Sequence, residues 1–382
     1  MKLSKYLLGD LIQQRREKNS FDGLPICGVT RDGFIPPKQQ DADTSLYNVF
    51  YKGDFVFNPA RMELNSIVFN DTYDKAICSS LYEVFYVKRT DIVVPEFLAL
   101  LVKQNWFTRY CEFLGSGSAR EYCRVANISE IEIELPPIEN QIEIAHQHKT
   151  LVERIALKKH INDNLEATAQ AVFQDQFASY YGCDELPKGY SIVSLDSLCT
   201  VKGGKRLPAD CELLDNPTEH PYIRVRDVGG SRYVCLTDQF QYIDEETHQA
   251  ISRYIVNTGD IVISIVGTIG LLGKIHSSLD NANLTENCVK LAGIHTVTSD
   301  YLYYTLCYKK QIKEIDLLTV GAVQAKLPMY NIQSMKILVP PTKVISDFQK
   351  KMNALDAQIE ANTMEIQKLN ELRSVLLAKL SD

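Results

Sequence analysis

The sequence predicts an α+β protein in which two mixed α/β domains are joined by two long antiparallel helices that form a coiled coil. Three observations favour this fold class. At 382 residues the chain exceeds one ordinary domain, its plan occurs twice, and each half ends in a heptad pattern. The repeat implies a pseudo-two-fold arrangement. We expect domains at residues 1–137 and 181–341, with long helices at 138–180 and 342–382.

An internal repeat organises the chain. Residues 127–137, which end in Pro-Pro, recur 204 residues later as residues 331–341. The other matching pairs are residues 8–12 with 194–198, 186 residues apart, and residues 53–57 with 259–263, 206 residues apart. Each match is weak alone, since Gly-Asp before an apolar run is an ordinary turn. Their common order predicts that the two halves share one fold.

Each half combines strand-like runs with one helix. The expected strands are residues 48–51, 55–57, 66–69 and 82–87 in the first half, and residues 222–225, 261–266 and 289–291 in the second. We expect helices at 95–113 and 299–315. Pro95 suits the first turn of a helix, and Gly115 is placed to end it. This alternation predicts a mixed α/β unit in each half.

Both segments after Pro-Pro carry apolar residues at a 4-3 spacing, which is a heptad seam. In the C-terminal segment the seam contains Phe348, Met352, Leu355, Ile359, Asn362, Ile366, Leu369, Arg373, Leu376 and Leu380. The central copy contains Ile144, His148, Leu151, Ile155, Lys158, Asn162, Leu165, Ala169, Val172 and Gln176. A helix of this length spans about 60 Å, so two paired helices would hold the domains at a fixed separation. The alternative is that each helix packs only on its own domain.

Lys158 and Asn362 are equivalent in the repeat, and both interrupt the apolar seam near its middle. A polar residue in a seam lowers stability but selects the register of the helices. We therefore hypothesise that these two side chains approach each other. The alternative is that both point to solvent.

Composition limits the possible functions. The net charge of −7 argues against nucleic-acid binding through bulk positive charge, so contacts with DNA would need local basic faces or a partner. The ten cysteines form no Cys-x-x-Cys pair, which favours free thiols in a reducing compartment and no metal site. No apolar run is long enough to cross a bilayer, and the N-terminus lacks the apolar core of a signal peptide. We expect a cytoplasmic protein without a membrane partner.

The motifs that would indicate catalysis do not fit. Neither Pro-Pro pair belongs to the Asp/Asn-Pro-Pro-aromatic motif of amino-group methyltransferases. The glycine-rich segment 267–275 has the wrong spacing for a phosphate loop, and Ile275 stands where that loop needs a hydroxyl. We therefore expect no catalytic residue, cofactor or metal in this chain.

The order of a globular half, Pro-Pro and a long helix, present twice, resembles the specificity subunits of Type I restriction-modification systems. The most family-like segments are residues 259–264 continuing to 267–270, and residues 331–341 before the final helix. The first half departs from this pattern, with Asn-Pro-Ala-Arg at 58–61 where the second has Ser-Ile-Val-Gly at 264–267. We therefore expect the two halves to differ residue by residue in this segment.

The resemblance implies a non-catalytic subunit with two target-recognition domains. Each domain would read one half of a bipartite site in double-stranded DNA, and the helices would set the unread spacer. Two methyltransferase subunits would dock on the helices and bring S-adenosylmethionine. A restriction and translocase subunit would bring ATP and Mg²⁺. The alternatives are a self-contained DNA-modifying enzyme and a coiled-coil scaffold.

The residues themselves suggest candidate DNA contacts. Arg120 and Gln324 are equivalent in the repeat and lie in loops of small and polar residues, and Arg and Gln can read guanine and adenine edges. Basic clusters near glycines or tyrosines are candidates for phosphate contact. The alternative for all of them is a solvated charged surface. The full candidate set is Arg15, Arg16, Arg61, Ser118, Arg120, Arg124, Lys202, Lys205, Arg206, Arg224, Arg226, Lys274, Gln324 and Lys326.

Overall fold

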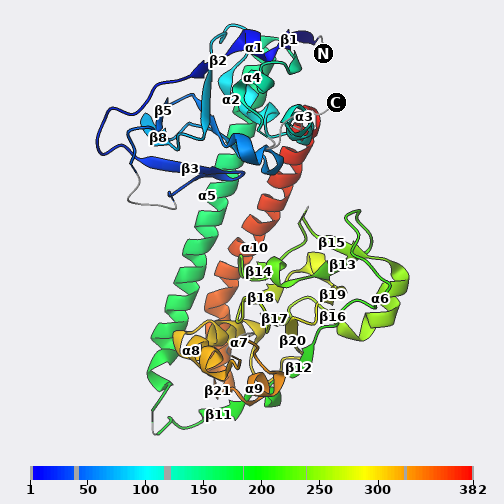
Figure 1. Ribbon diagram of the computed structural model, residues 1–382. Helices are drawn as coiled ribbons and strands as arrows, with labels where there is room; N and C mark the ends of the chain where they lie inside the picture. The colour runs from blue at the N-terminus through cyan, green and yellow to red at the C-terminus, as the bar shows by residue number, and fades with distance from the viewer. Residues whose placement is uncertain are drawn as a thin grey trace. The chain divides into compact units, whose positions relative to one another are not determined.

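The computed structural model describes residues 3–37, 43–115, 122–183, 185–237, 239–321 and 325–380. Its contacts divide the chain into two units, Met1–Arg154 with Asn370–Asp382, and Ile155–Leu369. Two long helices, α5 (Ile138–Phe177) and α10 (Thr342–Ala378), contribute residues to both units (Figure 1). Each unit therefore holds one globular half together with neighbouring parts of the two helices.

The first unit contains two four-stranded sheets and a two-stranded ladder. One sheet has the order β2 (Ile12–Arg15), β9 (Glu83–Val87), β6 (Phe55–Phe57) and β7 (Ile67–Phe69). The second has the order β4 (Gly33–Ile35), β3 (Ile26–Thr30), β8 (Lys75–Cys78) and β5 (Asn48–Tyr51). The ladder pairs β1 (Ser4–Leu7) with β10 (Glu132–Leu135). The helical segments are α1 (Leu8–Leu11), η1 (Pro59–Leu64), α2 (Pro95–Leu101), α3 (Asn105–Gly115) and α4 (Val125–Ile128).

The second unit repeats this plan and adds to it. Its larger sheet has the order β12 (Thr200–Gly203), β20 (Cys288–Ala292), β17 (Ile261–Ser264), β18 (Leu272–Ile275) and β14 (Tyr233–Val234). The other sheet has the order β15 (Gln241–Ile243), β13 (His220–Ile223), β19 (Ala282–Leu284) and β16 (Ile255–Val256). The ladder pairs β11 (Ser191–Ser194) with β21 (Lys336–Val339). The helices are α6 (Glu245–Ile251), α7 (Ser299–Leu306), α8 (Lys309–Leu318) and α9 (Met329–Ser334), with short 3-10 segments η2 (Ala178–Tyr180), η3 (Leu195–Ser197), η4 (Val225–Asp227), η5 (Ser252–Tyr254) and η6 (Ser277–Leu279).

The central strand of each unit is buried on both faces. In β6, Phe55 and Phe57 pack into one core cluster while Val56 packs into the other. In β17, Ile261 and Ile263 likewise face one cluster and Val262 the other. Alternate side chains of a strand point to opposite faces, so these apolar runs place the sheet between two cores. The predicted duplication of a mixed α/β plan is confirmed.

A shared turn introduces both central strands. Gly53 and Gly259 adopt φ angles of 90° and 85°, which favour glycine. The following aspartate then closes the turn, since Asp54 accepts the amide of Tyr51 at 2.8 Å and Asp260 accepts that of Asn257 at 3.0 Å. The Gly-Asp match between the halves therefore reflects one backbone geometry.

The start of each half aligns one residue away from the predicted offset. Leu8 N donates to Ile131 O, and Leu195 N donates to Met335 O, each at 2.9–3.0 Å. The ladders therefore make Leu8 equivalent to Leu195, 187 residues apart, where the sequence match had suggested 186. The sequence match aligns Asp10 with Asp196. In the structure the strand ladder and the buried leucines set the register instead, one residue further along.

The two domain helices are each broken, whereas the sequence predicted continuous helices at 95–113 and 299–315. In the first half a turn separates α2 from α3, and Gln104 N donates to Leu101 O at 3.0 Å. In the second half Tyr308 adopts an extended conformation between α7 and α8. Buried apolar residues flank both breaks, and neither break contains a proline or a glycine, so the sequence pattern does not show them.

Within the second unit, α5 and α10 pair in antiparallel fashion around a polar layer. Lys158 Nζ donates to Asn362 Oδ1 at 2.9 Å, and Asn362 Nδ2 donates to Asn162 Oδ1 at 2.8 Å. Lys158 also forms an ion pair with Glu365 at 2.8 Å. The Asn362 side chain is buried, and the neighbouring seam residues Ile359 and Leu369 are buried with it. The structure thus places the two interrupting polar residues in contact.

Near its C-terminal end α5 departs from the predicted seam. Phe173 and Phe177 are fully buried, although the heptad pattern had selected Val172 and Gln176. The Phe173 ring lies 5.7 Å from Tyr301 of α7 and 6.0 Å from Phe348 of α10. This end of the helix packs on the domain core as well as on its partner helix.

Among the described residues, no helix combines the length and apolar character that a membrane crossing demands.

We expect the polar layer to stabilise the helix pair. Asn362→Ala removes three hydrogen bonds and leaves Lys158 and Asn162 partly unsatisfied, so the free energy of unfolding of the full chain should fall by about 1–3 kcal/mol in urea denaturation. Asn164→Ala, on the exposed face of α5, is the matched control and should change it by less than about 0.5 kcal/mol. Equal effects of the two substitutions would show that the layer does not hold the helices together.

Candidate DNA interface

The candidate residues of the first half differ in solvent exposure and in whether their charges are paired. Arg15 is held by two hydrogen bonds to Asp54, at 2.6 and 2.9 Å, and lies between the rings of Tyr51 and Tyr86. Only a quarter of its side chain is exposed. Arg124 is 65% exposed and lies 3.9 Å from Glu83. Arg16 is exposed with Gln14 as its hydrogen-bond partner. Arg15 therefore supports the sheet, while Arg16 and Arg124 are available at the surface.

Arg61 lines a polar pocket of about 390 Å³ that the sequence did not indicate. Arg31 lines the same pocket, and Lys103 Nζ donates to Arg31 O at 2.6 Å. Burial, together with the charge of Arg31, lowers the pKa of Lys103 to about 8. Asp32 and Glu63 also line this pocket, so its charge is mixed. No sequence pattern indicates Arg31 and Lys103, because the two residues lie 72 positions apart and come together only in the fold.

Three candidates, Ser118, Arg120 and Gln324, lie outside the described residues. Lys326, which follows the second of these loops, is exposed and exchanges two backbone hydrogen bonds with Val320. Leu327 N donates to Ile265 O at 3.0 Å, which ties this loop to the end of β17. The described residues that follow 322–324 are thus anchored beside the central sheet of their domain.

The basic loop at 202–206 is held by a close backbone approach. A Cβ added to Gly204 would lie 2.0 Å from Thr285 O, whereas one added to Gly203 would meet nothing within 4 Å. Gly204 N and Lys205 N donate to Cys288 O and Leu284 O at 2.9 and 2.8 Å. Glycine at 204 therefore allows the loop to lie directly on the segment between β19 and β20.

The basic side chains of this loop point outward. Lys202 and Lys205 are exposed, and Lys205 Nζ lies 5.8 Å from the ring centroid of Tyr254. Arg206 is 81% exposed and pairs with Glu286 at 2.7 Å. Since surface ion pairs are weak, the Arg206 guanidinium can exchange Glu286 for a phosphate. This loop presents the most accessible of the predicted basic clusters.

The remaining candidates of the second half are engaged with acidic partners. Arg224 is 18% exposed, and Asp227 pairs with both Arg224 and Arg226. Lys274 is 14% exposed and donates to Asp300 at 2.5 Å. Lys274 therefore belongs to a buried charge cluster, and its accessible surface is small.

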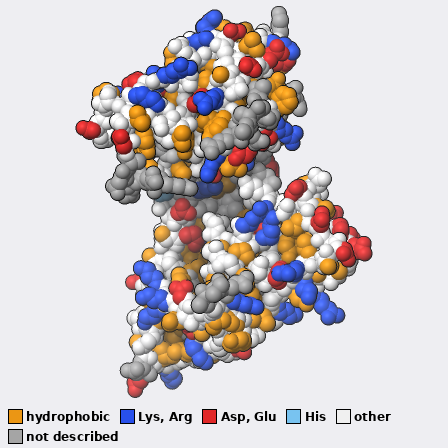
Figure 2. All heavy atoms as spheres, in the orientation of Figure 1, with side chains coloured by type: hydrophobic (Ala, Val, Ile, Leu, Met, Phe, Trp, Pro, Cys, Tyr) orange, Lys and Arg blue, Asp and Glu red, His pale blue; other side chains and the backbone are white. Residues whose placement is uncertain are grey.

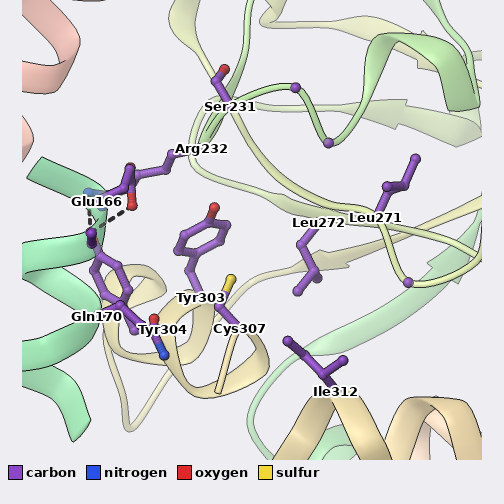
Figure 3. Close-up of a pocket in the computed structure, with 14 residues that line it drawn as sticks. Glu166, Gln170, Ser231, Arg232, Leu271, Leu272, Tyr303, Tyr304, Cys307 and Ile312 are labelled. Atoms are coloured by element: carbon purple, nitrogen blue, oxygen red, sulfur yellow. Dashed lines mark hydrogen bonds and ion pairs between the residues drawn. The ribbon is translucent and has the colours of Figure 1, made fainter. Parts of the chain in front are cut away.

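Arg232 is the centre of that cluster, and the sequence reasoning missed its role. Its side chain is fully buried, and its guanidinium donates to Asp300, Asp356 and Tyr304. Figure 3 shows it directed at Glu166 of α5 and Tyr304 of α7, beside a pocket of about 490 Å³. The only signal in the sequence is an arginine followed directly by Tyr233.

Burial and the two cations act in opposite directions on the pKa values of the carboxyl groups in this cluster. Burial raises the pKa of Glu166 to about 7, with Arg232 opposing the shift. Burial also acts on Asp300, but there Lys274 and Arg232 prevail and lower the pKa to about 2. Two cations thus share three carboxyl groups in a site with little solvent, an arrangement that demands specific geometry. The cluster therefore has a structural role, since it connects the second domain to α5 and α10.

Surface charge is mixed on both units. On the face shown in Figure 2, Lys and Arg side chains are interspersed with Asp and Glu. The net charge of −7 agrees with this pattern. Phosphate attraction would therefore come from local groups such as the 202–206 loop.

Comparison with known proteins identifies the family. The profile described as "Type I restriction modification DNA specificity domain" matches residues 35–167 and 187–373. The chain belongs to this family. The two matched segments correspond to the two halves of the repeat, as the resemblance of the sequence had indicated. DNA recognition is thus the role of the family to which both halves belong.

Named relatives agree with this assignment. The chain is 24% identical over 310 residues to the Type I restriction enzyme MjaIX specificity subunit of Methanocaldococcus jannaschii, covering 76% of this chain and 69% of that protein. It is 20% identical to the HindI specificity subunit of Haemophilus influenzae, covering 98% of each. The crystal structure of a Type I restriction-modification S subunit from M. genitalium has the same fold, with a TM-score of 0.57 at 18% identity over 99% of this chain and 96% of that one.

The adjacent glycines of the basic loop provide a matched test. Gly204→Ala forces backbone atoms apart, so we expect the free energy of unfolding to fall by at least about 1–3 kcal/mol. Gly203→Ala has open space and should differ little from wild type. Urea denaturation of the full chain measures both. Equal stabilities would mean that the loop does not depend on the close approach at Gly204.

Proposed function

We propose that this chain is the non-catalytic DNA-reading subunit of a multisubunit Type I restriction-modification enzyme. The observation that carries the proposal is duplication. The same sheet topology occurs twice, each copy matches the specificity family, and each copy leads into a long helix. Each domain reads one half of a bipartite site in double-stranded DNA. The helix pair sets the length of the unread spacer.

Partner subunits complete the enzyme in this proposal. Two methyltransferase subunits bind S-adenosylmethionine and methylate the DNA that the chain selects. A restriction and translocase subunit brings ATP and Mg²⁺. The acidic balance of the chain supports this division, because partners that surround the duplex can supply phosphate contacts. DNA affinity of the isolated chain is then weak and decreases with salt.

An apolar groove in the first unit supports docking of methyltransferase subunits on the helices. It has a volume of about 450 Å³ and lies between α5 and α10. Leu372 and Val375 line it, and each is 57% exposed. The other lining residues are His146, Gln147, Thr150, Leu151, Leu376 and Lys379. Such a groove suits the apolar face of a helix from a partner.

Methylation mapping tests the proposed function. The full chain, expressed in a host with its methyltransferase partner, should produce one bipartite methylated motif. Replacing residues 179–341 with the corresponding half of another family member should change one side of the motif and leave the other side intact. Changes on both sides, or methylation independent of this chain, would contradict the assignment of one domain to one half-site.

The groove gives a separate test of the partner. Leu372→Asp places a charge in an apolar site, so we expect the chain to lose co-purification with the methyltransferase subunit by at least about tenfold. Ser374→Asp, exposed on the same turn and outside the groove, is the matched control. Both variants should unfold like wild type in urea. Undiminished co-purification of Leu372→Asp would exclude this groove as the docking site.

A further inference from the structure

Four polar side chains of α10 form a stripe that faces the second domain. Gln349 Nε2 donates to Asp300 Oδ2 at 2.6 Å, and Asp356 accepts from Arg232. Glu360 lies 3.9 Å from His276 Nε2, and Gln367 Nε2 donates to Leu236 O at 2.8 Å. We call Gln349, Asp356, Glu360 and Gln367 the docking stripe.

The spacing of the docking stripe places it on one face of the helix. Its members are separated by seven, four and seven residues, so they recur at nearly the same angle along about 27 Å of helix. Each follows a seam residue directly, since Phe348, Leu355, Ile359 and Ile366 precede them. One edge of α10 therefore pairs with α5 while the adjacent edge holds the domain.

The docking stripe is absent from the other copy of the repeat. The residues 204 positions earlier are Ala145, Val152, Ala156 and Asp163. The domain segments that meet the stripe around Arg232 and Leu236 flank β14, a strand for which the sheets of the first unit have no equivalent among the described residues. The stripe and the added strand thus occur together in the second half only.

The contacts of the docking stripe constrain orientation. The apolar contact of α10 with the domain, through Ile345, Phe348 and Met352, lies near the N-terminal end of that helix. Apolar contact alone is not directional, so it leaves rotation about that end weakly resisted. The hydrogen bonds of Gln349 and, farther along, of Gln367 depend on direction and resist such rotation. A buried arginine with three partners is the most demanding of them.

We propose that the docking stripe fixes the orientation of the second domain on the helix pair and thereby determines which spacer lengths are accepted. One added base pair moves a half-site by about 3.4 Å along the duplex and by about 35° around it. A domain held rigidly accepts one spacer, whereas a domain that can turn by this angle accepts neighbouring spacers too. This inference rests on the proposed function. In this inference the stripe residues are positioning residues, which act through the domain that they hold.

The test uses the full chain with its methyltransferase partner. Once the methylated motif of wild type is known, a plasmid library presents the same two half-sites with spacers altered by one base pair in each direction. Gln367→Ala and Glu360→Ala remove the distal contacts, and Asp356→Asn weakens the central one while keeping its shape. Lys368→Ala and Asp347→Asn, both exposed on the same helix, are the matched controls.

Stripe variants should methylate the altered spacers about tenfold more, relative to the native spacer, than wild type does. The half-site bases should stay unchanged, and the controls should behave as wild type. Glu360→Gln, which keeps the length and polarity of the side chain opposite His276, should restore most of the discrimination.

Two results would overturn the inference. One is stripe variants that keep the strict spacer of wild type. The other is a change of half-site bases at constant spacer, since the stripe would then act on the reading surface. If wild type itself methylates no bipartite site, the proposed function fails first, so the two failures are distinguishable. Urea denaturation of Gln367→Ala and Glu360→Ala, whose contacts lie at the edge of the domain, checks that the variants fold.

Discussion

The pairing of α5 with α10 is the constraint on which the rest of the second unit depends. Two segments about 200 residues apart in the chain must bury their seams against each other, with Lys158, Asn162 and Asn362 meeting in the middle. A mismatch of register would leave these polar groups buried without partners, which costs more than the hydrogen bonds contribute. The polar layer therefore selects one register among the several that an apolar seam alone would allow.

Each globular half builds its own sheets around this framework. The central strands are apolar on both faces, so a core forms on either side of the sheet, and the short ladder before each long helix ties the start of a half to its end. The loops that carry basic residues project from these sheets. Loops carried on a rigid scaffold are the arrangement expected of a protein that recognises a ligand by its surface.

The two halves share topology but differ in how charges are used. In the first half Arg15 is enclosed by Asp54 and two tyrosines within the sheet. In the second half the buried arginine is Arg232, which lies at the junction of the domain with both long helices. The duplication thus explains why the two halves share a sheet topology. The different positions of Arg15 and Arg232 show that a buried or enclosed arginine stabilises a different part of each half.

The sequence by itself determined the fold class, the duplication, the heptad seam except at the C-terminal end of α5, and the polar pair at its centre, because these depend on local periodicity and on similarity between segments of one chain. It placed the candidate basic clusters but did not distinguish accessible groups such as Lys205 from engaged ones such as Lys274. The tertiary structure decided that distinction, together with the breaks in the domain helices, the pocket lined by Arg31 and Arg61, and the Arg232 cluster. These features join residues far apart in the sequence, and burial and hydrogen bonding arise only when the chain brings them together.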